Sequence, residues 1–118
     1  METAPVLALV RDLIFATKIS STARSLDVAV QVLRDPAQLK GQAGRLLIVD
    51  LNLPGAIPAA AAWATVTAHP VVGFVSHTDA ATIAAARDAR IDRVLPRSKF
   101  VEVLPELLGG LDSGEAAE

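Results

Sequence analysis

Polar side chains follow several short apolar runs in this sequence, and together they form a set that could hold a phosphoryl group and a divalent metal ion. The clearest run is residues 46–49, which are all aliphatic and lead directly into Asp50. Carboxylates bind Mg²⁺, one carboxylate can act as a nucleophile, and hydroxyl and cationic groups hold phosphoryl oxygens. The candidate residues are Asp12, Asp50, Asn52, Ser76, Arg97 and Lys99.

Alternating strands and helices must position these residues. Short unbroken apolar runs bounded by turn residues indicate buried strands, and the segments between them have helical spacing or composition. The expected strands cover residues 6–10, 27–33, 46–50, 71–75 and 92–95. The expected helices cover residues 13–26, 56–69, 79–90 and 98–108, with a short helix or irregular crossover over 36–44.

This alternation predicts an α/β protein with a flavodoxin-like, five-stranded parallel sheet in the order 2-1-3-4-5 and helices on both faces. In that order the first and third strands are neighbours at the switch point, where open α/β sheets bind ligands. We therefore expect Asp12 and Asp50 to lie together in one crevice.

The end of the chain contains two helix-breaking signals. Pro105 lies in the middle of the last predicted helix and predicts a kink or break, and Gly109-Gly110 predicts its end. We expect a single domain over residues 1–110, followed by a flexible acidic tail over residues 111–118.

Composition excludes several classes of protein. The 118 residues are 52% hydrophobic and 20% charged, which is typical of one globular domain. The absence of cysteine excludes a disulfide scaffold and a thiolate metal site. Because the net charge is −2 and basic clusters are absent, we expect no nucleic-acid partner. No apolar run reaches membrane-spanning length and no secretory signal is visible, so we expect a cytoplasmic protein without a membrane partner.

Residues 50–55, Asp-Leu-Asn-Leu-Pro-Gly, resemble the phospho-acceptor strand end of response-regulator receiver domains of the CheY-like superfamily. The resemblance extends over about residues 6–108. It implies that Asp50 accepts phosphate, and that Asp12, Asp50 and the backbone carbonyl of Asn52 hold Mg²⁺. It also implies that Ser76 is the hydroxyl residue that moves toward the phosphate.

The cationic positions depart from the receiver pattern. Arg11 stands where receivers have a second acid, which weakens the expected Mg²⁺ site. Arg11 either pairs with Asp50 or Asp12 in the space of the metal, or is a solvated surface arginine. Arg97 falls on the family's lysine and keeps the charge but not the geometry. Lys99 either substitutes for that lysine or points into solvent.

Two further positions bear on signalling. His77, directly after the hydroxyl residue, either crowds the phosphoryl pocket or is an exposed loop histidine. Val94 occupies the position of the family's aromatic switch residue, so the usual side-chain relay from Ser76 is not supported.

The leading hypothesis is a stand-alone, atypical receiver that binds a protein partner, either a histidine kinase or a downstream signalling protein, with weak or absent phosphorylation at Asp50. The expected surface, which is also a candidate for homodimerisation, is formed by the helices at 79–90 and 98–108 and the strand between them. Its central residues are Ile83, Arg87, Val94 and Phe100.

The competing hypothesis is a Mg²⁺-dependent receiver that takes phosphate from a kinase phosphohistidine onto Asp50 and later hydrolyses it. A third hypothesis is that the chain is a structural fragment of a larger assembly and that its crevice is inert. No cofactor-binding motif other than this metal site is predicted.

Overall fold

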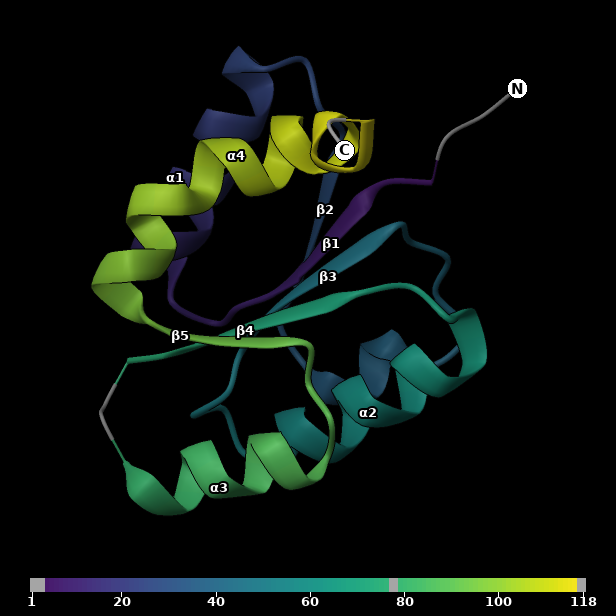
Figure 1. Cartoon of the computed structure of the whole chain (residues 1–118), viewed down its shortest axis with the longest axis vertical. Coiled ribbons are helices and arrows are strands. Elements are labelled where there is room, and N and C mark those ends of the chain that lie inside the picture. Colours follow the sequence, from purple (N-terminus) through teal and green to yellow (C-terminus); the bar gives the residue numbers. More distant parts are fainter. Residues whose placement is uncertain (1–3, 77–78, 117–118) are drawn as a thin grey trace.

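Five parallel strands form the single sheet of the protein. The computed structural model describes the backbone of residues 4–76 and 79–116, with side chains as far as residue 109. The strands are β1 (Val6–Leu9), β2 (Val30–Leu33), β3 (Leu46–Asp50), β4 (Val71–Val75) and β5 (Arg93–Pro96). Their order is β2-β1-β3-β4-β5, which confirms the predicted flavodoxin-like topology (Figure 1).

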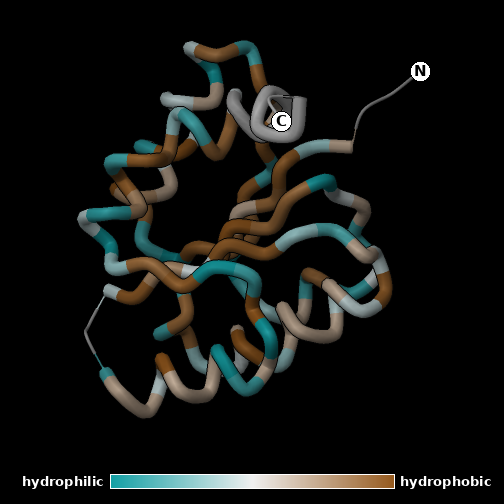
Figure 2. The backbone as a smooth tube through the Cα atoms, in the orientation of Figure 1, coloured by the Kyte–Doolittle hydropathy of each residue, from teal (hydrophilic) through white to brown (hydrophobic). Residues whose placement is uncertain are grey.

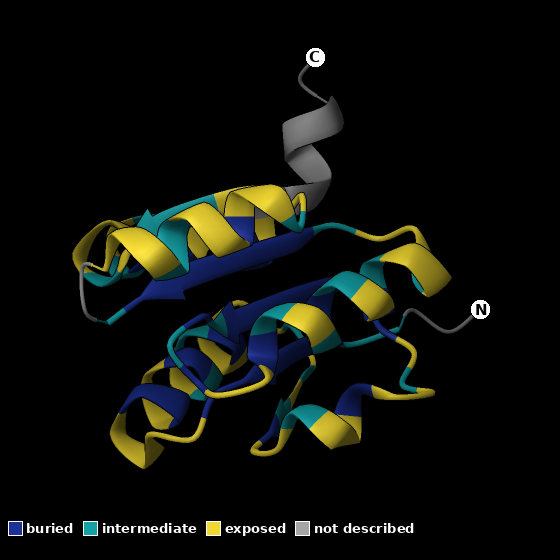
Figure 3. Ribbon diagram, turned by 90° about the horizontal axis from the view of Figure 1, so that it is seen from below, coloured by how far each residue is buried: buried dark blue, intermediate teal, exposed yellow. Residues whose placement is uncertain are grey.

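Helices cover both faces of this sheet (Figures 1 and 3). One face carries α1 (Leu13–Ser25) and α4 (Arg97–Ala116). The other face carries η1 (Pro36–Leu39), α2 (Ala56–Thr67) and α3 (Ala80–Asp88). No helix in the described part of the chain is long and apolar enough to cross a membrane.

The central strands are apolar on both sides because both faces of the sheet are covered. Side chains alternate along a strand, so Val6 and Ala8 pack under α1 and α4, while Leu7 and Leu9 pack under η1 and α2. All four residues of β1 are fully buried. Figure 2 shows this apolar centre as brown backbone running through the sheet.

Three phenylalanine rings form the centre of the layer under α1 and α4. The Phe15 and Phe74 ring centroids are 4.7 Å apart, and the Phe74 and Phe100 centroids are 4.8 Å apart. Phe100 is fully buried, so the prediction that it lies on a docking surface is wrong. The helix places this ring against the sheet because that burial removes a large apolar side chain from water.

The second strand is shorter than predicted, because residues 27–29 make the turn that precedes it. The backbone of Asp27 adopts φ 61°, just after the last turn of α1. Asp tolerates this left-handed conformation better than most residues, and strand pairing starts only at Val30.

The last helix does not end where the sequence predicts. α4 runs through Pro105 and past Gly109 to Ala116, so the predicted break and the predicted stop are wrong. Pro105 is exposed, between the buried anchors Leu104 and Leu107. Gly109 does not adopt a positive φ, and a glycine in helical conformation weakens a helix by about 1 kcal/mol without ending it. The separation of residues 111–118 as a flexible tail stays a prediction.

Candidate functional site

The carboxyl ends of β1, β3 and β4 meet at one edge of the sheet, as the parallel register requires. Leu9 of β1 is level with Val49 of β3, and Asp50 is level with Phe74 of β4. A pocket opens at this edge. Five of the six predicted site residues line it: Asp12, Asp50, Asn52, Ser76 and Arg97, together with Leu53 and Pro54.

The loop after β3 is fastened to the end of β4 by side-chain hydrogen bonds. Asp50 is half-buried, and its Oδ1 accepts a hydrogen bond from the backbone N–H of Asn52 at 3.0 Å. The Oδ1 of Asn52 in turn accepts from the backbone N–H of Ser76 at 2.6 Å. The Asn52 side chain therefore links the loop after β3 to the residue that follows β4.

Sequence reasoning missed this role, since it used only the backbone of Asn52. Asparagine side chains readily bond to nearby backbone groups in turns, and that preference was the available signal.

Gly55 allows the same loop to turn into α2. Its backbone adopts φ +83°, the left-handed conformation, at the position just before the helix. A side chain would strain this conformation, which gives a physical reason for glycine after Pro54.

Asp12 begins α1 as its N-cap residue. Its Oδ1 accepts from the backbone N–H groups of Ile14 at 2.9 Å and of Phe15 at 3.2 Å. These groups have no partner inside the helix, so the carboxylate stabilises the first turn. The N–H of Phe15 has the largest effect in lowering the pKa of Asp12, with smaller contributions from Ile14 and Arg97.

Arg97, the first residue of α4, forms an ion pair with Asp12. Its Nη2 is 3.4 Å from Oδ2 of Asp12, and its guanidinium carbon is 4.2 Å from the centroid of the Phe15 ring. A planar guanidinium can stack on a ring and face a carboxylate at once, which an ammonium group cannot do in the same way. Arg97 is therefore held from two sides.

Arg11 does not pair with Asp12. Its Nε donates to the backbone carbonyl of Arg34 at 3.3 Å, and Nη2 of Arg34 donates to the carbonyl of Arg11 at 3.3 Å. Arg11 is exposed and is not among the residues that line the pocket. Of the two alternatives for this residue, the pairing with Asp50 or Asp12 is not what the structure contains.

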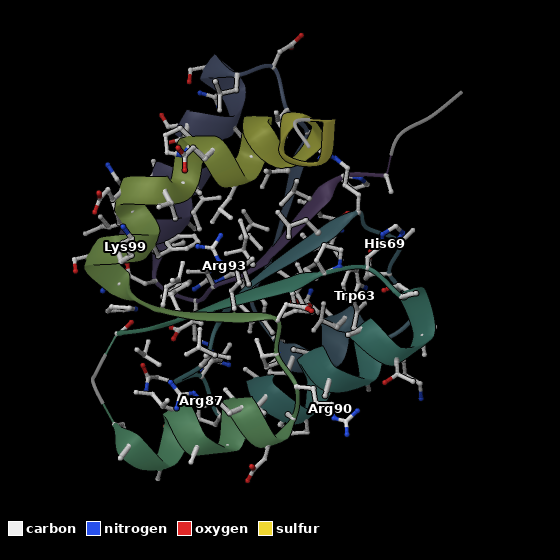
Figure 4. All side chains as sticks on the ribbon, in the orientation of Figure 1. Trp63, His69, Arg87, Arg90, Arg93 and Lys99 are labelled. Carbon is white, nitrogen blue, oxygen red and sulfur yellow. The ribbon has the colours of Figure 1, made fainter. Side chains whose placement is uncertain are left out.

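Lys99 also lies outside the pocket. Its Nζ is 3.8 Å from Oε2 of Glu102, one turn further along the exposed side of α4 (Figure 4). The structure therefore does not bring Lys99 together with the other predicted site residues.

Comparison with known proteins identifies the fold. No family model and no curated protein matches the sequence. Solved structures do match, at low identity. A BeF3-activated DrrB receiver domain superposes with a TM-score of 0.78 at 13% identity, covering 95% of this chain and 99% of that one. The chain has the receiver-domain fold.

Two other matching structures are of a phosphorylated and of a metal-bound response regulator. The phosphorylated cyanobacterial phytochrome response regulator RcpA matches with a TM-score of 0.74 at 15% identity, over 95% of this chain and 93% of that one. The Mn(2+)-bound form of response regulator Rcp1 matches with a TM-score of 0.70 at 18% identity, over 93% and 92%. At these identities the likeness shows the receiver fold alone.

The residues of this receiver fold do not fit a resident Mg²⁺ ion well. Mg²⁺ requires near-octahedral oxygen ligands, of which the protein supplies one or two carboxylates. Asp12 already bonds to two backbone N–H groups and faces the Arg97 guanidinium.

The two remaining sequence predictions concern residues near Ser76. His77 lies outside the described residues. Val94 of β5 is half-buried and packs against the apolar layer under α2 and α3. It therefore contributes to the core on that face.

Proposed function

We propose that this chain is a signalling module that works by binding a partner protein, with weak or absent phosphorylation at Asp50. The observation that carries the proposal is the use of Asp12. This carboxylate caps α1 and faces Arg97, so it is not free to serve a metal ion. The partner is a histidine kinase or a downstream signalling protein, and the proposed compartment is the cytoplasm.

Electrostatics supports this proposal. A phosphoryl group carries negative charge, and its transfer depends on metal ions or fixed cations that neutralise the charge as it develops. Arg97 is the cation that lines the pocket among the described residues, and its charge is directed to Asp12 and the Phe15 ring. Without a metal, an incoming phosphoryl group meets two carboxylates, which repel it.

The second candidate function is a phosphorylation-competent receiver. The shared pocket of Asp50, Asn52, Ser76 and Arg97 favours it. In this case a carboxylate oxygen of Asp50 attacks the phosphorus of a phosphohistidine, the P–N bond breaks, and the imidazole leaves. Mg²⁺ would be held by Asp12, Asp50 and the backbone carbonyl of Asn52, and it would neutralise phosphoryl charge.

We propose the face of α3, β5 and α4 as the partner or homodimer surface. Ile83 and Val94 are half-buried there with their inner sides against the core, and Arg87 and Arg93, labelled in Figure 4, are exposed residues of α3 and β5. An apolar centre flanked by arginines is typical of protein interfaces. Phe100 does not belong to this surface, because it is buried in the core.

The decisive experiment measures phosphorylation directly. The protein is incubated with acetyl phosphate and Mg²⁺, and its intact mass is compared with that of Asp50→Ala. We expect no phosphate adduct in either protein. We also expect that Mg²⁺ does not shift the NMR signals of the residues that line the pocket at Asp50. An adduct that forms in the parent protein and disappears in Asp50→Ala would establish the competent receiver instead.

A gain-of-function variant tests whether the two arginines that depart from the receiver pattern prevent phosphorylation of Asp50. The double variant Arg11→Asp with Arg97→Lys restores the acid and the lysine of the receiver pattern and removes the guanidinium beside Asp12. We expect it to gain a Mg²⁺-dependent adduct at Asp50. Arg34→Asp is the matched control, since it removes an exposed arginine that contacts Arg11 but does not line the pocket, and it should gain nothing.

A further inference from the structure

A second pocket lies between η1 and α2, and it shares no residue with the pocket at Asp50. The crossover from β2 to β3 contains only the single turn η1, so it covers the flank of α2 incompletely. The pocket has a volume of about 590 Å³. Its walls include Pro36 and Leu39 on one side and Ala62, Trp63 and Val66 on the other.

One hydrogen bond joins the two walls, and a second, within α2, satisfies another polar group of the pocket. The indole Nε1 of Trp63 donates to the backbone carbonyl of Gln42 at 3.0 Å and so ties α2 to the crossover. The Oγ1 of Thr67 donates to the carbonyl of Trp63 at 2.9 Å. Because these polar groups bond to each other, the pocket presents mainly carbon atoms to a ligand. Figure 4 shows Trp63 on the side of α2 that faces the sheet.

The pocket wall includes an exposed apolar side chain. Val66, on the last turns of α2, is 83% exposed, whereas Trp63 in the wall is only 4% exposed. A concave apolar pocket of this volume is within the range of small-molecule sites. Protein partners instead bury about 800 Å² on each side, over broader surfaces.

Lys40 gives the pocket its charge. It is the only charged residue among the described residues that line the pocket, and it is exposed. No ion pair or hydrogen bond of its ammonium group is found within the described part of the chain. An anionic group on a ligand would therefore find a cation at this position, next to an apolar interior.

We propose that this pocket binds a small amphipathic anion, that is, a molecule with an aromatic or aliphatic body and one acidic group. The body lies against Pro36, Ala62 and Val66, close to Trp63, and the acidic group faces Lys40. This site is independent of the chemistry at Asp50.

Trp63 is the only tryptophan of the chain and reports binding directly. Anilinonaphthalene sulfonate is titrated into the folded protein, and energy transfer from the indole to the probe is recorded. We expect saturable transfer with one site per chain. Lys40→Ala should weaken binding of this anion roughly two- to fivefold, as for an exposed ion pair. The neutral analogue N-phenylnaphthylamine should bind both proteins equally.

Two matched variants locate the site. Val66 and Ile14 are 83% and 82% exposed on different helices. We expect Val66→Asp to lower the probe affinity at least tenfold and Ile14→Asp to leave it unchanged, with both proteins folded by circular dichroism.

Three outcomes would overturn the proposal. They are the absence of energy transfer from Trp63, equal effects of Val66→Asp and Ile14→Asp, and a concentration-dependent dimer that Val66→Asp abolishes. The last outcome would assign the pocket to a second copy of the chain.

Discussion

At the scale of single residues, one guanidinium decides how the pocket at Asp50 is interpreted. Arg97 faces Asp12 and stacks on Phe15, so a carboxylate expected to hold metal is paired inside the protein. Arg11, one residue before Asp12, points to the carbonyl of Arg34 instead. The two arginines therefore have different roles although both replace residues of the receiver pattern.

The titration of Asp12 tests this arrangement. In the parent protein we expect its pKa below the ordinary value of about 3.9, chiefly because of the Phe15 N–H. In Arg97→Ala the pKa should rise but stay below that value, since the capping bonds remain. Lys99→Ala, which removes a charge outside the pocket, should not change it. Carboxyl carbon NMR over an acid titration measures all three.

The sign of the linkage follows from the lowered pKa. The folded state binds this proton more weakly than the unfolded state, so the stabilisation by Asp12 is fully present above the unfolded pKa of about 3.9. It is lost as the pH falls through the lower folded value. An Arg97→Ala protein with an unchanged Asp12 pKa would show that the pair contributes nothing to the titration.

At the scale of elements, the loop that carries Asn52 is held against the sheet through Gly73. The backbone N–H of Leu51 donates to the carbonyl of Phe74 at 2.9 Å. A Cβ placed on Gly73 would lie 2.6 Å from Cδ1 of Leu51, so the absence of a side chain at Gly73 lets Leu51 pack directly on β4. This contact positions the end of β3, and with it Asp50.

Gly73→Ala should destabilise the protein by about 1–3 kcal/mol, the usual cost of inserting atoms into a packed core. Urea unfolding measures this change. In the double variant Gly73→Ala with Leu51→Ala, the free energy of unfolding should fall by less than the sum of the two single changes, because the shorter side chain at position 51 removes the clash. Gly109→Ala is the control, as its Cβ would meet Leu26 only at an ordinary 3.5 Å; it should be neutral or stabilising.

At the scale of the whole molecule, one sheet lies between two apolar layers, and we expect the two layers to unfold as a single cooperative unit. Phe100 belongs to the layer under α1 and α4, and Trp63 to the layer under η1, α2 and α3. β1 contributes side chains to both layers along its length. Loss of packing in one layer should therefore also lower the stability of the other layer.

Phe100→Ala should lower the free energy of unfolding by about 3–5 kcal/mol. Unfolding followed by Trp63 fluorescence and by far-ultraviolet circular dichroism should shift to the same lower midpoint, although Trp63 lies on the opposite face of the sheet. The control Lys99→Ala removes an exposed residue next to Phe100 and should shift neither probe. Separate midpoints for the two probes would contradict a single cooperative unit.

The sequence by itself determined the alternation of strands and helices, the strand order, and the edge at which Asp12, Asp50, Asn52 and Ser76 meet. Apolar periodicity depends on local pattern, and the right-handed crossover rule reduces the possible strand orders to a few, of which the flavodoxin-like order was the one expected. Strand order in turn determines which strand ends are neighbours, so the members of the pocket followed without any knowledge of side-chain contacts.

Only the tertiary structure decided which arginine faces Asp12 and which role the Asn52 side chain has. Arginine side chains are long and flexible, so their charge can reach several partners from one backbone position, and the neighbours that select a partner come from distant segments. The extent of α4 beyond Gly109 was decided in the same way. The passage of α4 through Pro105 has a visible reason: Leu104, Leu107 and Leu108 are buried in the layer under α1 and α4, and this packing offsets the local cost of a proline in a helix, about 3 kcal/mol.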